Sequence, residues 1–277
     1  MKRAILFIGW GAKGTLDAEK AALRLPVEEQ ADVFIVSDHP LSLDTRARHT
    51  LVDFEMPHTL RKAEGITKYA PTGYSAVLYL DSDITLLDEV SFVFDKAELH
   101  GLAMAVAPTY VLDEYRSFGA VLEREGLPRA SQVQYQAGLI AFSHRAEVFE
   151  LFDKWIALGA KHSDIWIRDQ PQLSLAIELC GLQPYVLSKN YNFRGIYEPV
   201  IGKVRVWHNF APIPKNLNDY ARPYPPRLLS RHKIRQLWRI ETHNDWKTFY
   251  FRTLIVFPLY RFLSRFIPRR QQVRSQT

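Results

Sequence analysis

The feature that most constrains how this chain folds is a run of four apolar or aromatic residues, 77–80, that leads directly into Asp81-Ser82-Asp83. Such a run predicts a buried strand, and it delivers two carboxylates to one spot at its C-terminal end. An ionised carboxylate is rarely buried alone, because an unpaired charge in a low dielectric costs several kcal/mol. In open α/β sheets, ligands bind outside the carboxyl ends of the strands. The motif therefore suggests a divalent metal and, with it, a phosphorylated substrate.

The rest of the first 200 residues alternates between strand-like and helix-like segments. This alternation predicts an α/β fold with a mostly parallel sheet, and the nearly all-apolar strands indicate that helices flank both faces. Two later short runs, 185–187 and 204–207, are expected to add edge strands. The predicted strands are 4–8, 33–36, 77–80, 102–107 and 139–142, and the predicted helices are 16–25, 60–69, 148–158 and 172–179.

Length and composition limit the class of protein. A chain of 277 residues that is 47% hydrophobic can bury a full core. Its single cysteine, Cys180, excludes an internal disulfide and a cysteine-based zinc site, and we expect it to pack in the core. The basic residues at the start precede an apolar run too short for a signal peptide, and no stretch reaches the ~18 apolar residues of a membrane span. We therefore expect a cytoplasmic location.

Charge divides the chain into two parts. Residues 221–277 hold 13 lysines and arginines against two acidic residues, a net charge of +11, whereas the preceding part is mildly acidic. We predict a catalytic domain over 1–220 and a basic, aromatic-rich helical extension over 221–277, joined through the proline-rich stretch 212–226. Aromatic residues interleaved with arginine suit the inner face of an anionic membrane, although a helix packed on the domain has the same pattern. Nucleic acid is not expected as a partner, because the upstream domain has the features of an enzyme.

The Asp-x-Asp pattern has three interpretations. Asp83 can simply cap a following helix or turn. Residues 81–85 also resemble the Asp-x-Asp-x-Thr loop of haloacid-dehalogenase-type phosphatases, in which Asp81 would be the nucleophile. That family carries the loop on its first strand and adds a later acidic motif, whereas here two strands precede the loop and no such cluster follows.

The third interpretation accounts for more of the chain. Residues 79–84 resemble the metal-binding Asp-x-Asp of nucleotide-sugar glycosyltransferases with the GT-A fold, especially the glycogenin-like and galactosyltransferase-like groups. Other segments follow in that family's order, from about residue 3 to residue 210. They are the first strand with its loop (4–11), the basic pair Arg61-Lys62, the strand that begins Tyr135-Gln136-Ala137-Gly138, the dipeptide Asp169-Gln170, and the late strand that ends at His208.

This resemblance implies a GT-A-type, Rossmann-like fold and a set of roles. Asp81, Asp83 and His208 would bind Mn²⁺ or Mg²⁺, with the mixed oxygen and imidazole ligands favouring Mn²⁺; a half-buried histidine at a strand end is the simpler alternative for His208. The donor would be a nucleotide-sugar, expected to be a UDP-sugar, and the acceptor a glycan or a lipid-linked glycan. Analogy with the glycogenin-like group implies retention of configuration. An alternative function is a non-catalytic binding module that the C-terminal extension recruits to a membrane; it would keep the fold but need no metal.

The remaining site residues follow from the same resemblance. Asp169 and Gln170 would bind and position the donor sugar, although Asp169 also suits the N-terminus of the helix that follows it. The residues expected to contact other parts of the donor are Gly9 and Gly11 for the base or ribose, Arg61 and Lys62 for the phosphates, and Gln136 and Gly138 for the sugar.

Overall fold

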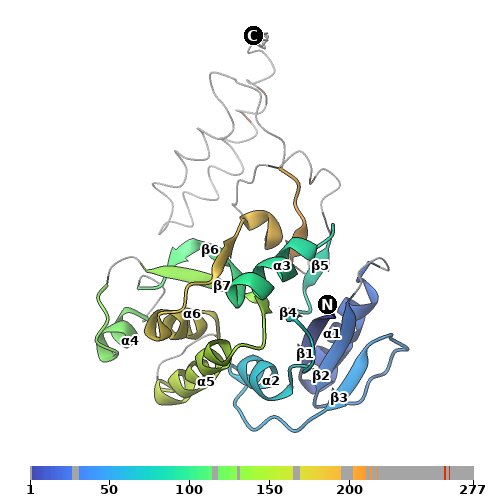
Figure 1. Cartoon of the computed structure of the whole chain (residues 1–277), viewed down its shortest axis with the longest axis horizontal. Coiled ribbons are helices and arrows are strands. Elements are labelled where there is room, and N and C mark those ends of the chain that lie inside the picture. The colour runs from blue at the N-terminus through green and yellow to red at the C-terminus, as the bar shows by residue number, and fades with distance from the viewer. Residues whose placement is uncertain are drawn as a thin grey trace.

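The computed structural model describes residues 2–26, 31–113, 118–129, 132–164, 169–194 and 202–209, and the single positions 213, 217, 259 and 262. The proline-rich stretch and nearly all of the extension lie outside these residues. Figure 1 shows a sheet with helices on both sides. In chain order the elements are β1 (Arg3–Gly9), α1 (Gly11–Leu23), β2 (Asp32–Ser37), β3 (Arg48–Leu51), α2 (Arg61–Tyr69), β4 (Ala76–Leu80), β5 (Ile84–Leu86), α3 (Ser91–His100), β6 (Leu102–Val111), α4 (Phe118–Arg124), β7 (Val133–Phe142), α5 (Ala146–Lys161), α6 (Asp169–Cys180), β8 (Tyr185–Leu187), the 3₁₀ helix η1 (Lys189–Tyr191) and β9 (Val206–His208).

Seven strands form one sheet in the order β3-β2-β1-β4-β7-β6-β8. Each neighbouring pair is parallel except the two pairs that β7 makes, with β4 and with β6. The sheet is therefore mostly parallel, as the alternation of segments predicted. The strand that carries Asp81 at its end, β4, lies in the middle of the sheet between β1 and β7, where both faces are covered.

Alternate strand residues enter two cores, one on each face of the sheet. In β1, Leu6 and Ile8 belong to one core, while Ile5 and Phe7 belong to the other. Helices α2, α4, α5 and α6 cover the first core and α1 and α3 the second, an arrangement that Figure 1 shows for the larger helices. The continuous apolar strands of the sequence thus reflect burial on both faces.

A second, two-stranded sheet, the β5–β9 ribbon, lies outside the main one. The chain turns after β4, with the Ile84 amide donating to the Asp81 carbonyl at 3.0 Å, and β5 then pairs antiparallel with β9. Residues 204–207 were expected to add an edge strand to the main sheet, and this was wrong: β9 pairs with β5 because the turn has carried the chain away from the sheet. The other expected edge strand, β8, does lie at the sheet's edge beside β6.

The position of Cys180 corrects one further expectation. Cys180 is exposed rather than packed in the core, because it is the last residue of α6 and precedes Gly181, whose φ of 63° ends the helix.

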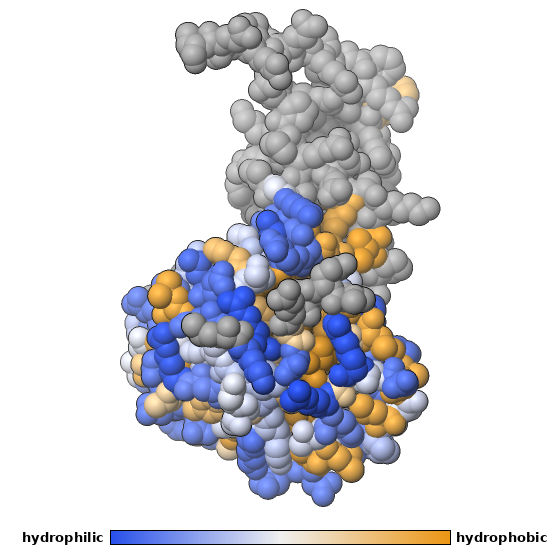
Figure 2. All heavy atoms as spheres, turned by 45° about the vertical axis from the view of Figure 1, so that its right-hand side comes forward, coloured by the Kyte–Doolittle hydropathy of each residue, from blue (hydrophilic) through white to orange (hydrophobic). Residues whose placement is uncertain are grey.

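In Figure 2, hydrophilic and apolar side chains are interspersed over the described body. Within the described ranges, none of the helices combines the length and the apolar character that crossing a membrane requires.

Candidate metal and sugar-nucleotide site

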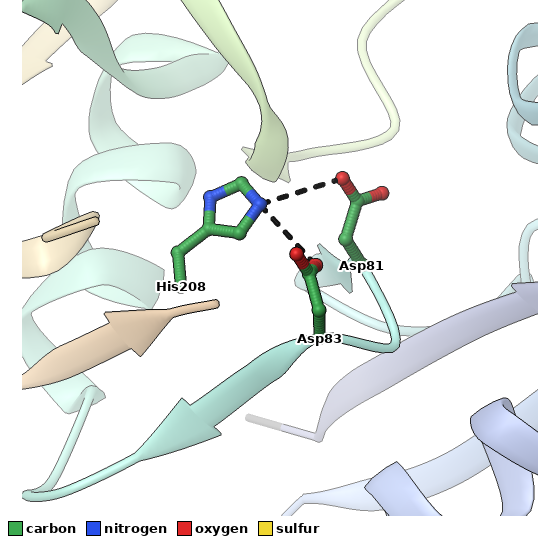
Figure 3. Close-up of side chains that lie close together, drawn as sticks. All are labelled: Asp81, Asp83 and His208. Carbon is green, nitrogen blue, oxygen red and sulfur yellow. Dashed lines mark ion pairs between the residues drawn. The ribbon is translucent and has the colours of Figure 1, made fainter. Parts of the chain in front are cut away.

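Three predicted ligands lie together at the C-terminal end of β4. One ligand atom from each of Asp81, Asp83 and His208 lies within 4.8 Å of the others. His208 Nε2 is 3.3 Å from an Asp83 carboxylate oxygen and 3.8 Å from an Asp81 oxygen. Figure 3 shows the imidazole and both carboxylates pointing toward one another. Two carboxylates and an imidazole nitrogen suit a divalent cation of the Mn²⁺ or Mg²⁺ kind.

Backbone hydrogen bonds hold these three residues from two directions. The Asp81 amide donates to the Gly138 carbonyl at 2.8 Å, which ties the first carboxylate to β7 of the main sheet. The Asn209 amide donates to the Asp83 carbonyl at 2.9 Å, and Ile84 pairs with His208 in the β5–β9 ribbon. The second carboxylate and the histidine are therefore fixed to each other, and the first carboxylate is fixed to the sheet.

The histidine is held on its remaining sides as well. His208 Nδ1 lies 2.6 Å from Asn192 Oδ1, and both side chains are buried. A Cβ atom on Gly138 would lie 2.1 Å from His208 Cε1, so only glycine leaves room for this ring. Burial would raise the pKa of Asp83, but the neighbouring His208 side chain outweighs it and lowers that pKa, which keeps the carboxylate ionised.

A buried lysine connects the metal cluster to the predicted sugar-binding acid. Lys62 Nζ is 2.6 Å from Asp169 Oδ2 and 2.9 Å from Asp81 Oδ1, and it donates to the Ala137 carbonyl at 3.2 Å. Burial would lower the pKa of Lys62, but Asp169 and Asp81 raise it by a larger amount, so the ammonium stays charged. The structure thus brings Lys62, Asp81 and Asp169 together, although they come from α2, the β4 turn and the start of α6.

Tyr79 contacts both Asp81 and Lys62 of this cluster. Its hydroxyl donates to Asp81 Oδ1 at 2.5 Å, and the Lys62 ammonium lies 5.4 Å from the centre of its ring. Burial raises the pKa of Tyr79 well above its ordinary value, and the negative charge of Asp81 raises it further. The hydroxyl is therefore a permanent donor, and Asp81 Oδ1 receives both a neutral and a charged hydrogen bond while Oδ2 faces His208.

Gln136 belongs to β7, and Gln170 at the start of α6 contacts the next residue of that strand. Gln170 Oε1 accepts a hydrogen bond from the Ala137 amide at 3.4 Å, and the Trp155 indole donates to the Asp169 carbonyl at 3.0 Å. Gln136 is buried, and its Oε1 has no hydrogen-bond partner in the part of the chain that the structure describes. These contacts fix the start of α6 against β7; contact with a sugar stays a prediction for both glutamines.

A second group forms around Asp38 and includes Gly11, predicted to contact the base or ribose, and Arg61, predicted to contact the phosphates. The Gly11 amide, at φ 66°, donates to Asp38 Oδ1 at 2.7 Å, and an Arg61 nitrogen lies 3.6 Å from Asp38 Oδ2. Gly9 has a packing role, because a Cβ there would lie 2.7 Å from the Gly14 carbonyl oxygen. Burial opposes ionisation of Asp38, but hydrogen bonds from His39 and Gly11 lower its pKa.

Sequence reasoning missed three residues of the site: Asp38, Tyr79 and Asn192. Asp38 directly follows β2, so the same end-of-strand rule that singled out Asp81 could have found it. Tyr79 was noted as part of an apolar strand and of the Asp-x-Asp segment, but with no role of its own. Asn192 offered no signal, since an asparagine between a 3₁₀ turn and a short bridge usually serves the turn itself.

Comparisons with known proteins are limited to fold. No protein-family model matches this sequence, and a search of curated proteins finds no match either. Solved structures do match. The galactosyltransferase LgtC in complex with donor and acceptor sugar analogs is 15% identical, with a TM-score of 0.52 over 76% of this chain and 87% of that one. The apo form of mouse xyloside xylosyltransferase 1 is 13% identical, with a TM-score of 0.51 over 77% of this chain and 100% of that one.

A third structure covers more of this chain but less of its own. The glycosyltransferase GlyE of Streptococcus pneumoniae TIGR4 is 17% identical, with a TM-score of 0.49, over 99% of this chain and 66% of that one. The chain thus spans just under two thirds of the length of that protein. LgtC and the mouse protein confirm the expected GT-A-type α/β fold, because a shared fold is what a likeness at these identities establishes.

Proposed function

We propose that this protein is a metal-dependent glycosyltransferase that moves a sugar from a nucleotide-sugar, most simply a UDP-sugar, to a glycan or lipid-linked acceptor. The observation that carries the proposal is the Asp81, Asp83 and His208 cluster at the end of a central strand, in a fold shared with sugar-transferring proteins. Retention of configuration rests on analogy with the glycogenin-like group alone.

The residues present fit a divalent cation. Asp81 Oδ2, the Asp83 carboxylate and His208 Nε2 converge, and Gly138 leaves the room that the imidazole needs. We infer Mn²⁺ before Mg²⁺, because imidazole beside two carboxylates favours the softer ion. When bound, such an ion would act as a Lewis acid on the negative charge that develops on the departing diphosphate.

The chain's own side chains supply the remaining functions. We infer that the Asp169 carboxylate binds hydroxyl groups of the donor sugar, because Lys62 fixes it at 2.6 Å beside the metal cluster. The three N–H donors of Lys62 already reach Asp169, Asp81 and the Ala137 carbonyl, so we infer that this lysine holds the two carboxylates in place. A carboxylate here would also stabilise the positive charge of an oxocarbenium-like sugar. Asp38, beside the Gly11 amide, is ionised and offers an acceptor to a ribose hydroxyl.

The C-terminal extension is proposed to bind an anionic membrane surface. The support is the net charge of +11 over residues 221–277, with aromatic residues between the arginines. Leu259 and Phe262, the two described residues of this segment, are 55% and 54% exposed. We propose the division at about residue 220 on the same grounds, with peripheral attachment at the inner face of the membrane.

The function is tested by thermal unfolding with a panel of nucleotide-sugars, with and without Mn²⁺. A ligand at about 100 times its Kd adds about 2.7 kcal/mol, which is about 5–11 °C for a chain of this size. Asp83→Ala should abolish the metal-dependent shift and the transfer of sugar, whereas Asp164→Ala, which removes an exposed carboxylate paired with Arg124, should change neither. Turnover of a nucleotide-sugar that resists both EDTA and Asp83→Ala would contradict the metal-dependent mechanism.

A further inference from the structure

We propose that Asn192 is a positioning residue that sets the tautomer and the orientation of the His208 ring, so that Nε2 presents its lone pair toward Asp81 and Asp83. The inference rests on the proposed function, because it concerns the cation that those three residues would hold. Asn192 is not one of the three candidate ligands, and its role would be to orient one of them.

The position of Asn192 is fixed by backbone pairing on both sides of it. Its own amide donates to the Lys189 carbonyl at 3.1 Å, which closes η1. The next residue, Phe193, donates to the Val206 carbonyl at 3.0 Å and accepts from the His208 amide at 2.9 Å. Two backbone hydrogen bonds of Phe193 thus join the segment that carries Asn192 to β9, and they bring the asparagine and the histidine side by side.

The chemistry of the contact selects one form of the ring. The amide oxygen Oδ1 can only accept, so at 2.6 Å the Nδ1 atom of His208 must carry the proton. A neutral imidazole with its proton on Nδ1 has its lone pair on Nε2, and that atom is 3.3 Å from Asp83 and 3.8 Å from Asp81. With the opposite amide orientation the NH₂ group would face Nδ1, and the proton would move to Nε2, where it would block a cation.

Two further observations fit this role. Asn192 and His208 are 2% and 3% exposed, so water does not compete for Nδ1. Asn192 Nδ2 is buried and has no hydrogen-bond partner among the described residues, so none of their contacts opposes this orientation of the amide. A metal-binding histidine almost always donates its other N–H to an oxygen, and loss of that oxygen typically weakens metal affinity 10- to 100-fold.

The test compares three variants by titration calorimetry with Mn²⁺, after circular dichroism has shown that each is folded. Asn192→Leu keeps the size of the side chain but removes the acceptor, and should weaken Mn²⁺ binding by about 10- to 100-fold. Asn192→Asp keeps an acceptor oxygen and should bind Mn²⁺ at least as tightly as the unaltered protein. Asn190→Leu is the matched control, because that asparagine lies two residues away and donates to the Lys203 carbonyl instead; its affinity should not change.

A second measurement needs no variant. With Mg²⁺ bound, the ¹⁵N chemical shifts of the His208 ring should show a proton on Nδ1 and none on Nε2. A proton on Nε2, equal Mn²⁺ affinity in Asn192→Leu, or a loss in Asn192→Asp as large as in Asn192→Leu would each overturn the proposal. Metal binding that follows the expected order in a protein that transfers no sugar would leave Asn192's role standing and reject the proposed function instead.

Discussion

Gly138→Ala should damage the site through a single steric conflict with His208. A Cβ at this position would lie 2.1 Å from Cε1 and 2.9 Å from each ring nitrogen of the histidine. Gly138 is not among the described glycines with a positive φ, so alanine adds no backbone strain there. Carbon atoms come into ordinary contact at about 3.5 Å, so the ring must move by about 1.4 Å.

The magnitude follows from how firmly that ring is held. His208 is buried, hydrogen-bonded to Asn192 at 2.6 Å and paired in the β5–β9 ribbon, so it cannot move without breaking a contact. Overpacking of this kind typically costs about 1–3 kcal/mol. A metal–ligand distance tolerates only about 0.2 Å, so a shift of about 1.4 Å should also remove His208 from the ligand set and abolish Mn²⁺-dependent stabilisation.

The assay is a double-mutant cycle in urea, in EDTA so that metal does not contribute. Gly138→Ala should lower the free energy of unfolding by about 1–3 kcal/mol in the unaltered protein and by less than about 0.5 kcal/mol in the His208→Ala background. Gly14→Ala is the control, because its Cβ would lie 3.8 Å from the nearest neighbouring atom, the Gly9 carbonyl carbon, and should not destabilise α1. An equal cost of Gly138→Ala in both backgrounds would show that the ring is not what excludes a side chain.

Three further changes probe the surroundings. Lys62→Met should lower the free energy of unfolding by about 1–3 kcal/mol, since two carboxylates lose their shared cation. The pKa of Lys62 is raised in the folded state from an ordinary value of 10.5, so the lysine is charged at about pH 6 and at about pH 9. Urea titrations should therefore give the same deficit at both pH values. Burial opposes ionisation of Glu64, but the Met56 and Glu55 amides and Lys68 lower its pKa, so Glu64→Gln should cost about 1–3 kcal/mol at neutral pH, and the cost should fade as the pH drops below its ordinary value of 4.5. Incubation with a phosphate ester or beryllium fluoride should leave Asp81 unmodified by mass spectrometry, whereas an aspartyl-phosphate would favour the phosphatase interpretation.

The sequence predicted the elements whose burial is continuous. Strands such as β1 and β4 are buried along nearly their whole length, so an apolar run identifies them. β3 was missed because all four of its residues are exposed, and β5 because it has only three residues directly after the acidic turn. An exposed strand such as β3 is defined by its partner, and a sequence pattern of apolar residues cannot report a partner.

The same limit applies to the site. Asp81 and Asp83 were found because two carboxylates at the end of an apolar strand suggest metal binding, whereas His208 was assigned through the resemblance to GT-A glycosyltransferases. The contacts of Lys62 could not be found in this way, because Asp169 lies 107 positions further along the chain, and only the packing of α2 and α6 on one face brings the two together. A lysine in the first turn of a helix looks like a solvated residue until the sheet is assembled.

The division of the three candidate ligands between two sheets has a consequence for synthesis of the chain. Asp81 is held by β7 of the main sheet, whereas Asp83 is tied to the ribbon that β9 completes. During translation both carboxylates emerge early, but the imidazole and the strand that carries it emerge some 125 residues later. A nascent chain that ends before residue 204 would hold an acidic turn without its third ligand, so metal capture should come only after nearly all of the described fold has left the ribosome.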